Sequence, residues 1–126
     1  MVLVDSSVWI EYFKGNDATL PLNDLIDSNN ICVNDLILAE LLPSINHKKE
    51  EGLKDLLLTI TRLNIEINWN QLIQMQTANL KNGINKVGIA DLIIAQNAIE
   101  NDIELFTLDK HFLLMNELHG IRIYER

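Results

Sequence analysis

Cysteine, glycine and proline are scarce in this sequence. Cys32 is the one cysteine among 126 residues, so no intramolecular disulfide can form, and a reducing cytoplasm is the expected compartment. It lies in the apolar run at 31–33, which favours a buried apolar role over a nucleophilic one. With five glycines, two prolines and no repeat or low-complexity tract, the chain is expected to be mostly regular structure in a single domain, 1–126.

Long apolar runs and an excess of basic residues are also absent. No apolar run approaches the roughly 20 residues that cross a membrane. The short apolar start at 1–4 lacks the basic beginning of a signal peptide, so no membrane partner is expected. Lysine and arginine total 10 against 18 acidic residues, a net charge of −8, which disfavours a broad basic face for nucleic acid. This balance still allows an enzyme that meets RNA through bound metal and a few lysines, or a basic protein partner.

Short apolar runs alternate with stretches of helical periodicity. This alternation predicts an α/β fold with a mainly parallel sheet, in which ligands bind beyond the carboxyl ends of the strands. Strands are predicted at 1–4, 31–33, 65–67, 104–107 and 121–124, and helices at 8–13, 18–27, 36–42, 48–61, 70–81, 88–100 and 109–118.

Three helix boundaries rest on particular residues. Ser6 or Ser7 is expected to cap the first helix. Asn34 or Asp35 is expected to cap the helix after the second strand. Pro43 is expected to end or kink that helix, because proline lacks an N–H group and crowds the preceding turn.

Four acidic residues are placed where such a sheet builds a site. Asp5 follows the first strand directly, and Asp109 lies just after the fourth. Asp91 is in the first turn of the helix that begins at Gly88, and Glu40 lies inside the helix after the second strand. The expected fold therefore brings all four toward the carboxyl ends of the strands.

Each acid also has a purely structural interpretation. Asp5 could begin a turn, Asp91 could oppose a helix dipole for about 0.3–1 kcal/mol, and Asp109 could be an N-cap worth about 1 kcal/mol. Glu40 is harder to explain in this way, because it interrupts a run of leucines and isoleucines, and a carboxylate on an apolar face is costly without a partner. Asp91 is likewise surrounded by apolar residues, in a helix that its pattern predicts to be buried on most sides.

A divalent cation would reconcile four clustered carboxylates. Converging carboxylates repel one another, and their pKa values rise. All-oxygen ligands suit Mg²⁺ or Mn²⁺, whereas a zinc site would need suitably spaced cysteines and histidines, which this sequence lacks. Magnesium binds substrate phosphates, and the acids therefore indicate phosphodiester hydrolysis.

Taken in order, these motifs resemble the PIN-domain ribonucleases, and most of all the VapC-type toxins of bacterial and archaeal toxin–antitoxin pairs. The resemblance rests on VLVDSSVW at 2–9, Glu40, GIADLIIA at 88–95 and LFTLDKHF at 105–112, and it spans nearly the full chain. It implies a PIN-like three-layer α/β/α fold with a mainly parallel sheet of four to five strands. It also implies a metal-dependent endoribonuclease, a homodimer, and a cognate VapB-type antitoxin that inserts a basic residue at the acidic site.

The resemblance assigns roles to the acids. Asp5, Asp91 and Asp109 are the implied ligands of one or two Mg²⁺ or Mn²⁺ ions, and Glu40 is implied to join them directly or through water. The implied reaction is attack by a metal-activated water on an RNA phosphodiester, which leaves a 5′-phosphate and a 3′-hydroxyl. No side-chain nucleophile is needed.

Other residues near the acids have two interpretations each. By the resemblance, Ser6 and Thr107 match hydroxyl positions that support the ligands or the substrate phosphate. Lys86, Lys110 and His111 flank the acids and are either RNA phosphate contacts or solvated surface residues.

Three aromatic residues lie in the first helix. Trp9 shares a helix face with Tyr12 or with Phe13, at spacings of three and four. They are either core residues or part of a groove for an antitoxin helix.

Two rival functions fit parts of the pattern. A receiver-like phosphoacceptor signalling domain would need two adjacent acids after the first strand and an aspartate ending the third, and neither is present. A non-catalytic PIN-fold binding module would not need the acids, so the complete set of four argues against it. The sequence leaves the identity of the RNA open.

Overall fold

In the computed structural model, which describes residues 1–125, short strands alternate with helices. The elements are β1 (Val2–Val4), α1 (Ser6–Phe13), the 3₁₀ turn η1 (Asp17–Thr19), α2 (Pro21–Asp27), β2 (Ile31–Val33), α3 (Asp35–His47), α4 (Glu51–Thr59), β3 (Thr61–Arg62), α5 (Trp69–Lys81), α6 (Ile89–Glu100), β4 (Glu104–Phe106) and α7 (Lys110–His119).

The four strands form one all-parallel sheet in the order β3-β2-β1-β4. β1 lies between β2 and β4, and its three residues, like those of β2, are all buried. Strands buried on both faces read as continuous apolar runs, which is why these segments lack alternation. The predicted α/β fold with a mainly parallel sheet is confirmed, and the ends of β1, β2 and β4 meet at one edge, where Asp5, Asn34 and Thr107 follow them.

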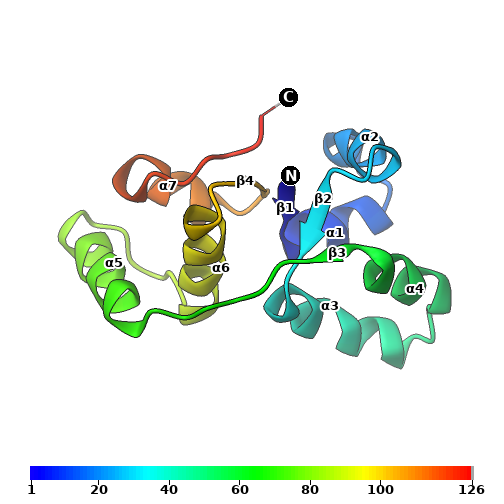
Figure 1. The fold of residues 1–126 in the computed structure, drawn as a ribbon, viewed down its shortest axis with the longest axis horizontal. Coiled ribbons are helices and arrows are strands. Elements are labelled where there is room, and N and C mark those ends of the chain that lie inside the picture. The colour runs from blue at the N-terminus through cyan, green and yellow to red at the C-terminus, as the bar shows by residue number, and fades with distance from the viewer. Residues whose placement is uncertain (126) are drawn as a thin grey trace.

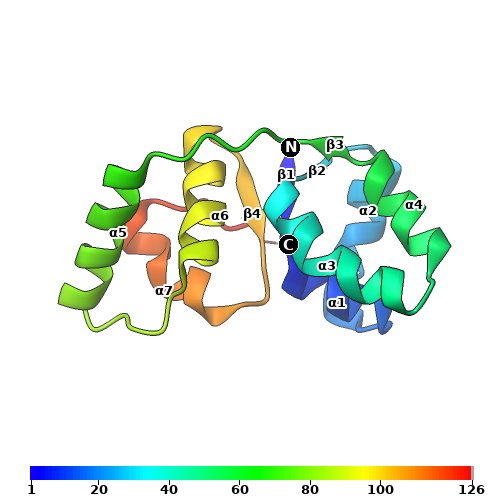
Figure 2. The ribbon, with the colours of Figure 1, turned by 90° about the horizontal axis from the view of Figure 1, so that it is seen from below.

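The helices form two groups on opposite sides of the sheet (Figures 1 and 2). Helices α5, α6 and α7 pack together beyond β4, and α1 to α4 gather beyond β2. The core between them is built mainly from valine, leucine and isoleucine, with Trp9 and Phe112 as its largest fully buried side chains. No helix within residues 1–125 has both the length and the apolar character needed to span a bilayer.

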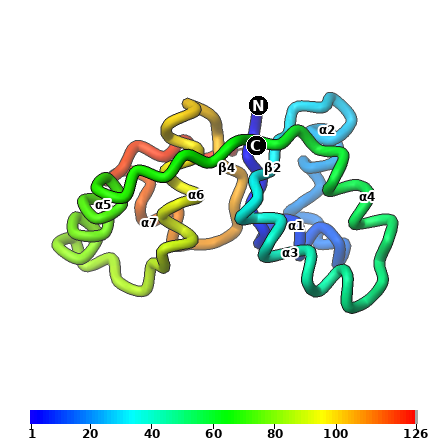
Figure 3. Tube along the Cα trace, turned by 60° about the horizontal axis from the view of Figure 1, so that its bottom comes forward, coloured from blue at the N-terminus to red at the C-terminus, as the bar shows by residue number. Residues whose placement is uncertain are grey.

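Two strand predictions are corrected by the structure. The third strand is the two-residue β3, not 65–67, because α4 ends at Thr59 and the chain meets β2 at once, where the Leu63 N–H donates to the Val33 carbonyl at 2.7 Å. Residues 63–68 instead cross without regular structure from the α4 side to α5, as the green tube of Figure 3 shows. The predicted strand at 121–124 is reduced to one parallel bridge, between Leu105 and Ile123.

Three helix boundaries also differ from expectation. The cap of α1 is Asp5, not Ser6 or Ser7. The predicted helix at 18–27 begins as η1 and restarts at Pro21, which suits a first helical position because its missing N–H would have no partner there. The predicted helix at 48–61 is the shorter α4, Glu51–Thr59.

Helix α3 does not end at Pro43 but continues to His47. The proline costs one backbone hydrogen bond, to the Ala39 carbonyl. Leu41 and Ile45, on either side of it, are both buried, and their burial outweighs that loss. The cap of α3 is Asn34, one of the two expected residues, whose side chain accepts from the Ile37 N–H at 2.9 Å.

Candidate active site

Asp5 is buried at the carboxyl end of β1, with 3% of its surface exposed. Its Oδ1 accepts hydrogen bonds from the backbone N–H of Ser7, at 3.0 Å, and from the Ser7 hydroxyl. Its Oδ2 accepts from the Thr107 hydroxyl at 2.6 Å. Burial raises the pKa of Asp5, and the bonds from Ser7 and Thr107 oppose that rise. The carboxylate is therefore held in one orientation before any ligand binds.

Thr107 and Ser7 join the ends of β1 and β4. The Thr107 oxygen that donates to Asp5 also accepts from the backbone N–H of Asp109 at 3.0 Å. The Ser7 oxygen accepts from the Leu108 N–H at 3.0 Å. Thr107 was expected to support the acids, but Ser7 was considered only as a cap, because its partner Leu108 is 101 positions away in the sequence.

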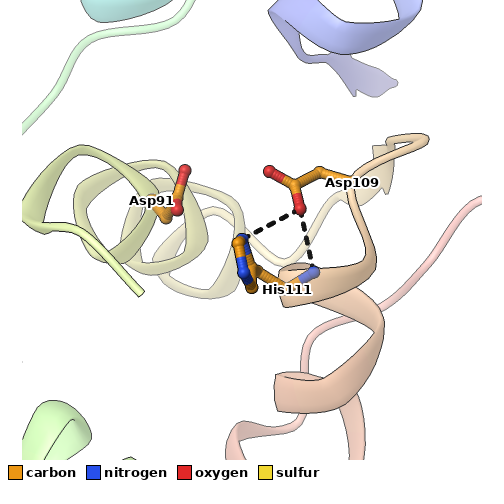
Figure 4. A group of neighbouring side chains, drawn as sticks. All are labelled: Asp91, Asp109 and His111. Atoms are coloured by element: carbon orange, nitrogen blue, oxygen red, sulfur yellow. Dashed lines mark hydrogen bonds and ion pairs between the residues drawn. The ribbon is translucent and has the colours of Figure 1, made fainter. Parts of the chain in front are cut away.

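Asp109 and Asp91 lie together with His111, as Figure 4 shows. One ligand atom from each of the three lies within 4.8 Å of the others. Asp109 caps α7 by accepting from the His111 N–H at 2.9 Å, and the same oxygen lies 3.1 Å from His111 Nδ1. The sequence pattern predicts His111 only as an RNA contact or a surface residue, whereas the structure adds its imidazole to the acidic cluster.

Asp91 occupies the first turn of α6, whose N-cap is Gly88. Burial, followed by the charge of Asp109, raises the pKa of Asp91, while a backbone hydrogen bond at Gly88 and the nearby His111 lower it. The rest of α6 is buried from Ile94 to Ala98, so the helix holds this acid on a rigid element.

Glu40, the fourth predicted acid, lies in α3. It is exposed, although Leu36 is half-buried and Ile37 is buried. Glu40 therefore keeps contact with solvent, although Leu36 and Ile37 lie one turn earlier on its helix face. Partial loss of water around the carboxylate, then the charges of Asp5 and Asp91, raise the pKa of Glu40, and a hydrogen bond from Ser6 lowers it.

The donor set fits a hard divalent cation. Asp91, Asp109 and His111 each offer a ligand atom within 4.8 Å of the others. The charges of Asp5 and Asp91 act on Glu40, and the charge of Asp109 acts on Asp91. Such a group is stabilised by a cation that neutralises it, and carboxylate ligands suit Mg²⁺ or Mn²⁺. The imidazole of His111 moves the preference toward Mn²⁺, because imidazole suits transition metals better than magnesium.

The residues expected to contact RNA or the antitoxin differ in their exposure to solvent. Lys86 and Lys110 are exposed. Trp9 is fully buried and packs against Tyr12 and Phe13, at ring-centroid distances of 6.0 and 5.8 Å, so its side chain belongs to the core and not to a surface groove. Tyr12 and Phe13 are half-buried.

A cleft of about 320 Å³ lies between α1 and α3. Its walls include Phe13 and Leu41, its rim includes Lys14 and Lys48, and Glu40 lines it as well. Because Glu40 belongs both to the acidic group and to the lining of the cleft, the cleft opens beside the acidic group.

Comparison with known families and structures gave the following matches. A family model described as PIN domain matches residues 2–118. The structure is similar to that of VapBC2 from Rickettsia felis bound to a DNA fragment from its promoter, with 18% sequence identity, a TM-score of 0.75 and 98% of each chain covered. A comparison with curated proteins found no match.

Two further structures have similar folds. DNA-bound VapBC from Salmonella typhimurium is 17% identical, with a TM-score of 0.74, 98% of this chain and 96% of that chain covered. VapBC-1 from nontypeable Haemophilus influenzae is 16% identical, with a TM-score of 0.69, 99% of this chain and 98% of that chain covered. At these identities the likeness concerns the fold, along nearly the whole length of both chains.

Proposed function

This chain belongs to the PIN domain family, and from that membership we propose that it is a metal-dependent endoribonuclease, the VapC-type toxin of a toxin–antitoxin pair. The observation that carries the proposal is the grouping of Asp91, Asp109 and His111, whose ligand atoms lie within 4.8 Å of one another. The charges of Asp5 and Asp91 on Glu40 support the addition of Asp5 and Glu40 to this group. Family membership excludes the receiver-domain alternative.

We assign the acids by their surroundings. Asp5, Asp91 and Asp109, together with His111, would hold the cation, because Asp5 is fixed by its hydrogen bonds and the other three lie within 4.8 Å of one another. A divalent cation bound here supplies charge neutralisation at a phosphate and lowers the pKa of water. Glu40 is the acid most open to solvent, and we assign it to orient the attacking water and to accept its proton.

The remaining polar groups support these acids or the substrate. Ser6 holds Glu40 by a hydrogen bond, and Thr107 and Ser7 hold Asp5. Lys110 lies next to Asp109 in the chain and is exposed, so it is placed to contact an RNA phosphate. Lys86, also exposed, precedes α6 and has the same role in this proposal.

The antitoxin is proposed to bind in the cleft between α1 and α3. The similar structures from Rickettsia felis and Salmonella typhimurium are VapBC complexes, which supports a VapB-type partner. An apolar helix of that partner would cover Phe13 and Leu41, and a basic residue would reach Glu40. Occupation of the cleft would then block the acidic group.

A second copy of the chain is proposed to pack on α5. Trp69, Ile73 and Leu80 on α5 and Ile89 at the start of α6 are between 55% and 63% exposed, and all four line one cleft. None of the residues that line this cleft is charged. Two copies of an acidic chain can therefore meet there without like charges facing each other.

Cleavage of RNA by the purified protein tests the proposed activity. Total bacterial RNA is incubated with the protein in Mg²⁺ or Mn²⁺, and the test is repeated with EDTA and with Asp91→Asn. The matched control is Glu100→Gln, which removes an exposed acid from the same helix.

We expect discrete fragments from the unaltered protein and from Glu100→Gln, and none with EDTA or with Asp91→Asn. Cleavage that survives both EDTA and Asp91→Asn would contradict the assigned site. Folded protein that cleaves no RNA in either metal would favour a non-catalytic binding module.

A further inference from the structure

Two buried asparagines link the helices that carry Glu40 and Asp91. Asn34 has 0% of its surface exposed and Asn97 has 2%. Asn34 follows β2 and caps α3, while Asn97 lies in α6. The Asn34 side-chain amide donates to Oδ1 of Asn97 at 2.9 Å. The link joins residues that are 63 positions apart in the sequence.

Each hydrogen bond of this pair has a fixed donor and a fixed acceptor. Oδ1 of Asn34 accepts from the Ile37 N–H at 2.9 Å, so its amide group is left to donate to Asn97. The amide group of Asn97 in turn donates to the Asn64 carbonyl at 2.9 Å. Turning either side-chain amide over would set acceptor against acceptor or donor against donor. The arrangement is therefore held from both ends.

The same pair reaches three separate parts of the fold. Asn64 belongs to the irregular segment that crosses the molecule between β3 and α5 (Figure 3). Asn97 thus holds α3, α6 and the crossing segment together at one buried point. Buried polar groups with all partners in place specify one geometry, because any displacement leaves an unpaired group in the core.

The hydrogen bond between Asn34 and Asn97 lies at a fixed distance along α3 from Glu40 and along α6 from Asp91. Glu40 is six residues after Asn34 and Asp91 is six residues before Asn97, about 9 Å along each helix axis. The two carboxylates repel each other, and the hydrogen bond between Asn34 and Asn97 opposes a separation of the helices that carry them. We propose that Asn34 and Asn97 are positioning residues that set the separation of Glu40 and Asp91. The consequence for metal binding rests on the proposed function.

The test uses a substitution that keeps the helix cap. Asn34→Ser still caps α3, because serine and asparagine are comparable N-caps, but its side chain is too short to reach Asn97. The matched control is Asn68→Ser. Asn68 caps α5 by accepting a hydrogen bond from the Gln71 N–H at 3.1 Å. Helix α5 contains none of the four acids of the site.

Two measurements are made on each protein. Mn²⁺ affinity is determined from the electron paramagnetic resonance signal of the free ion. The spacing of α3 and α6 is measured in metal-free protein with spin labels on Asn46→Cys and Glu100→Cys, both exposed positions. Cys32 is buried, and burial raises the pKa of its thiol to about 11, so it does not react with the label.

We expect Asn34→Ser to bind Mn²⁺ roughly tenfold more weakly, the lower end of the loss seen when support for metal ligands is removed, and to broaden the label distances. Asn68→Ser should change neither. A folded Asn34→Ser with unchanged affinity and unchanged distances would overturn the inference. So would an equal effect of Asn68→Ser, since the role would then be merely structural.

Two further results can be distinguished from a failure of the inference: a variant that does not fold, and an unaltered protein that binds no Mn²⁺. If Asn34→Ser does not fold, the double variant Asn34→Ser/Asn97→Ala replaces it, because removing both partners leaves fewer buried groups unpaired. If the unaltered protein binds no Mn²⁺, the proposed function fails. The label distances then still decide whether the pair fixes the two helices.

Discussion

Among single residues, Thr107 contacts two of the acids through its side-chain hydroxyl. One oxygen donates to Asp5 and accepts from the Asp109 backbone, so it sets two acids relative to each other. Ser7 repeats this arrangement toward Leu108. Hydroxyls suit such positions because one oxygen both donates and accepts.

Replacing Thr107 with valine keeps the side chain's shape and removes the hydroxyl. We expect Thr107→Val to lower the free energy of unfolding by about 1–3 kcal/mol, because Asp5 and the Asp109 N–H lose a partner. Mn²⁺ affinity should fall roughly tenfold. Urea unfolding and calorimetric titration measure the two effects. Thr107→Ser, which keeps the hydroxyl, is the control, and equal losses in both variants would contradict the explanation.

The raised pKa values of Asp5, Glu40 and Asp91 predict how stability depends on pH. Above about pH 4, the carboxylates of the unfolded chain lose their protons before those of the folded chain. The folded state then binds more protons, so stability falls as pH rises through the folded pKa values. We expect metal-free protein to lose free energy of unfolding over this window.

Mg²⁺ should reverse that loss near neutral pH, because it binds the ionised folded group and not the unfolded chain. Urea unfolding at several pH values, with Mg²⁺ or with EDTA, measures both effects. Asp91→Asn should be less sensitive to pH than the unaltered protein, while Glu100→Gln, on the same helix, should not differ from it. An equal pH response in Asp91→Asn would count against this account.

At the scale of elements, α3 is the helix whose form departs from its local sequence. Local rules predict that Pro43 ends or kinks it, yet the helix runs on to His47, and Leu41 and Ile45 on either side of the proline are buried. The free energy lost with the missing hydrogen bond at Pro43 therefore still lowers the stability of the folded protein. Glu40 lies in the turn that the proline ring crowds.

Pro43→Ala should therefore stabilise the protein. Pro43 is exposed, so no packing is lost, and alanine restores the hydrogen bond to the Ala39 carbonyl. We expect the free energy of unfolding to rise by about 1–3 kcal/mol, up to the full helix-propensity difference. Ser44→Ala, at the next exposed position, should change it by less than about 0.5 kcal/mol. No gain from Pro43→Ala would mean that α3 does not continue through residue 43 in solution.

At the scale of the whole molecule, the exposed apolar face of α5 is the feature that suits self-association. It carries Trp69, Ile73 and Leu80 on a chain whose net charge is −8. A two-fold contact places the same patch on both copies, so a charge introduced there faces its own counterpart.

If the proposed dimer forms through α5, Ile73→Glu should convert it to a monomer, because two carboxylates would be buried close together in the interface. Sedimentation equilibrium measures the mass at several concentrations. Leu113→Glu, which places the same charge on exposed apolar surface of α7, is the control and should leave the mass unchanged. Dimers of Ile73→Glu as tight as those of the unaltered protein would place the contact elsewhere.

Local sequence pattern is sufficient to predict the fold class and most helices. It also selects the acids Asp5, Glu40, Asp91 and Asp109 as candidates. These follow from local pattern: apolar runs, helical periodicity, and acids placed just after strands. The same local rules placed the third strand at 65–67, which is wrong, and predicted that Pro43 ends or kinks α3, which does not end there. Burial and pairing with distant residues overrode them.

The contacts that hold the site together are visible only in the folded protein, because they join residues that are distant in the sequence. The hydrogen bond of Ser7 with Leu108 and that of Asn34 with Asn97 join residues 101 and 63 positions apart. His111 joins the acids because the first turn of α7 meets the first turn of α6. Local periodicity carries no information about such pairs. They form only when parallel strands bring their carboxyl ends to one edge and buried polar groups must find partners there.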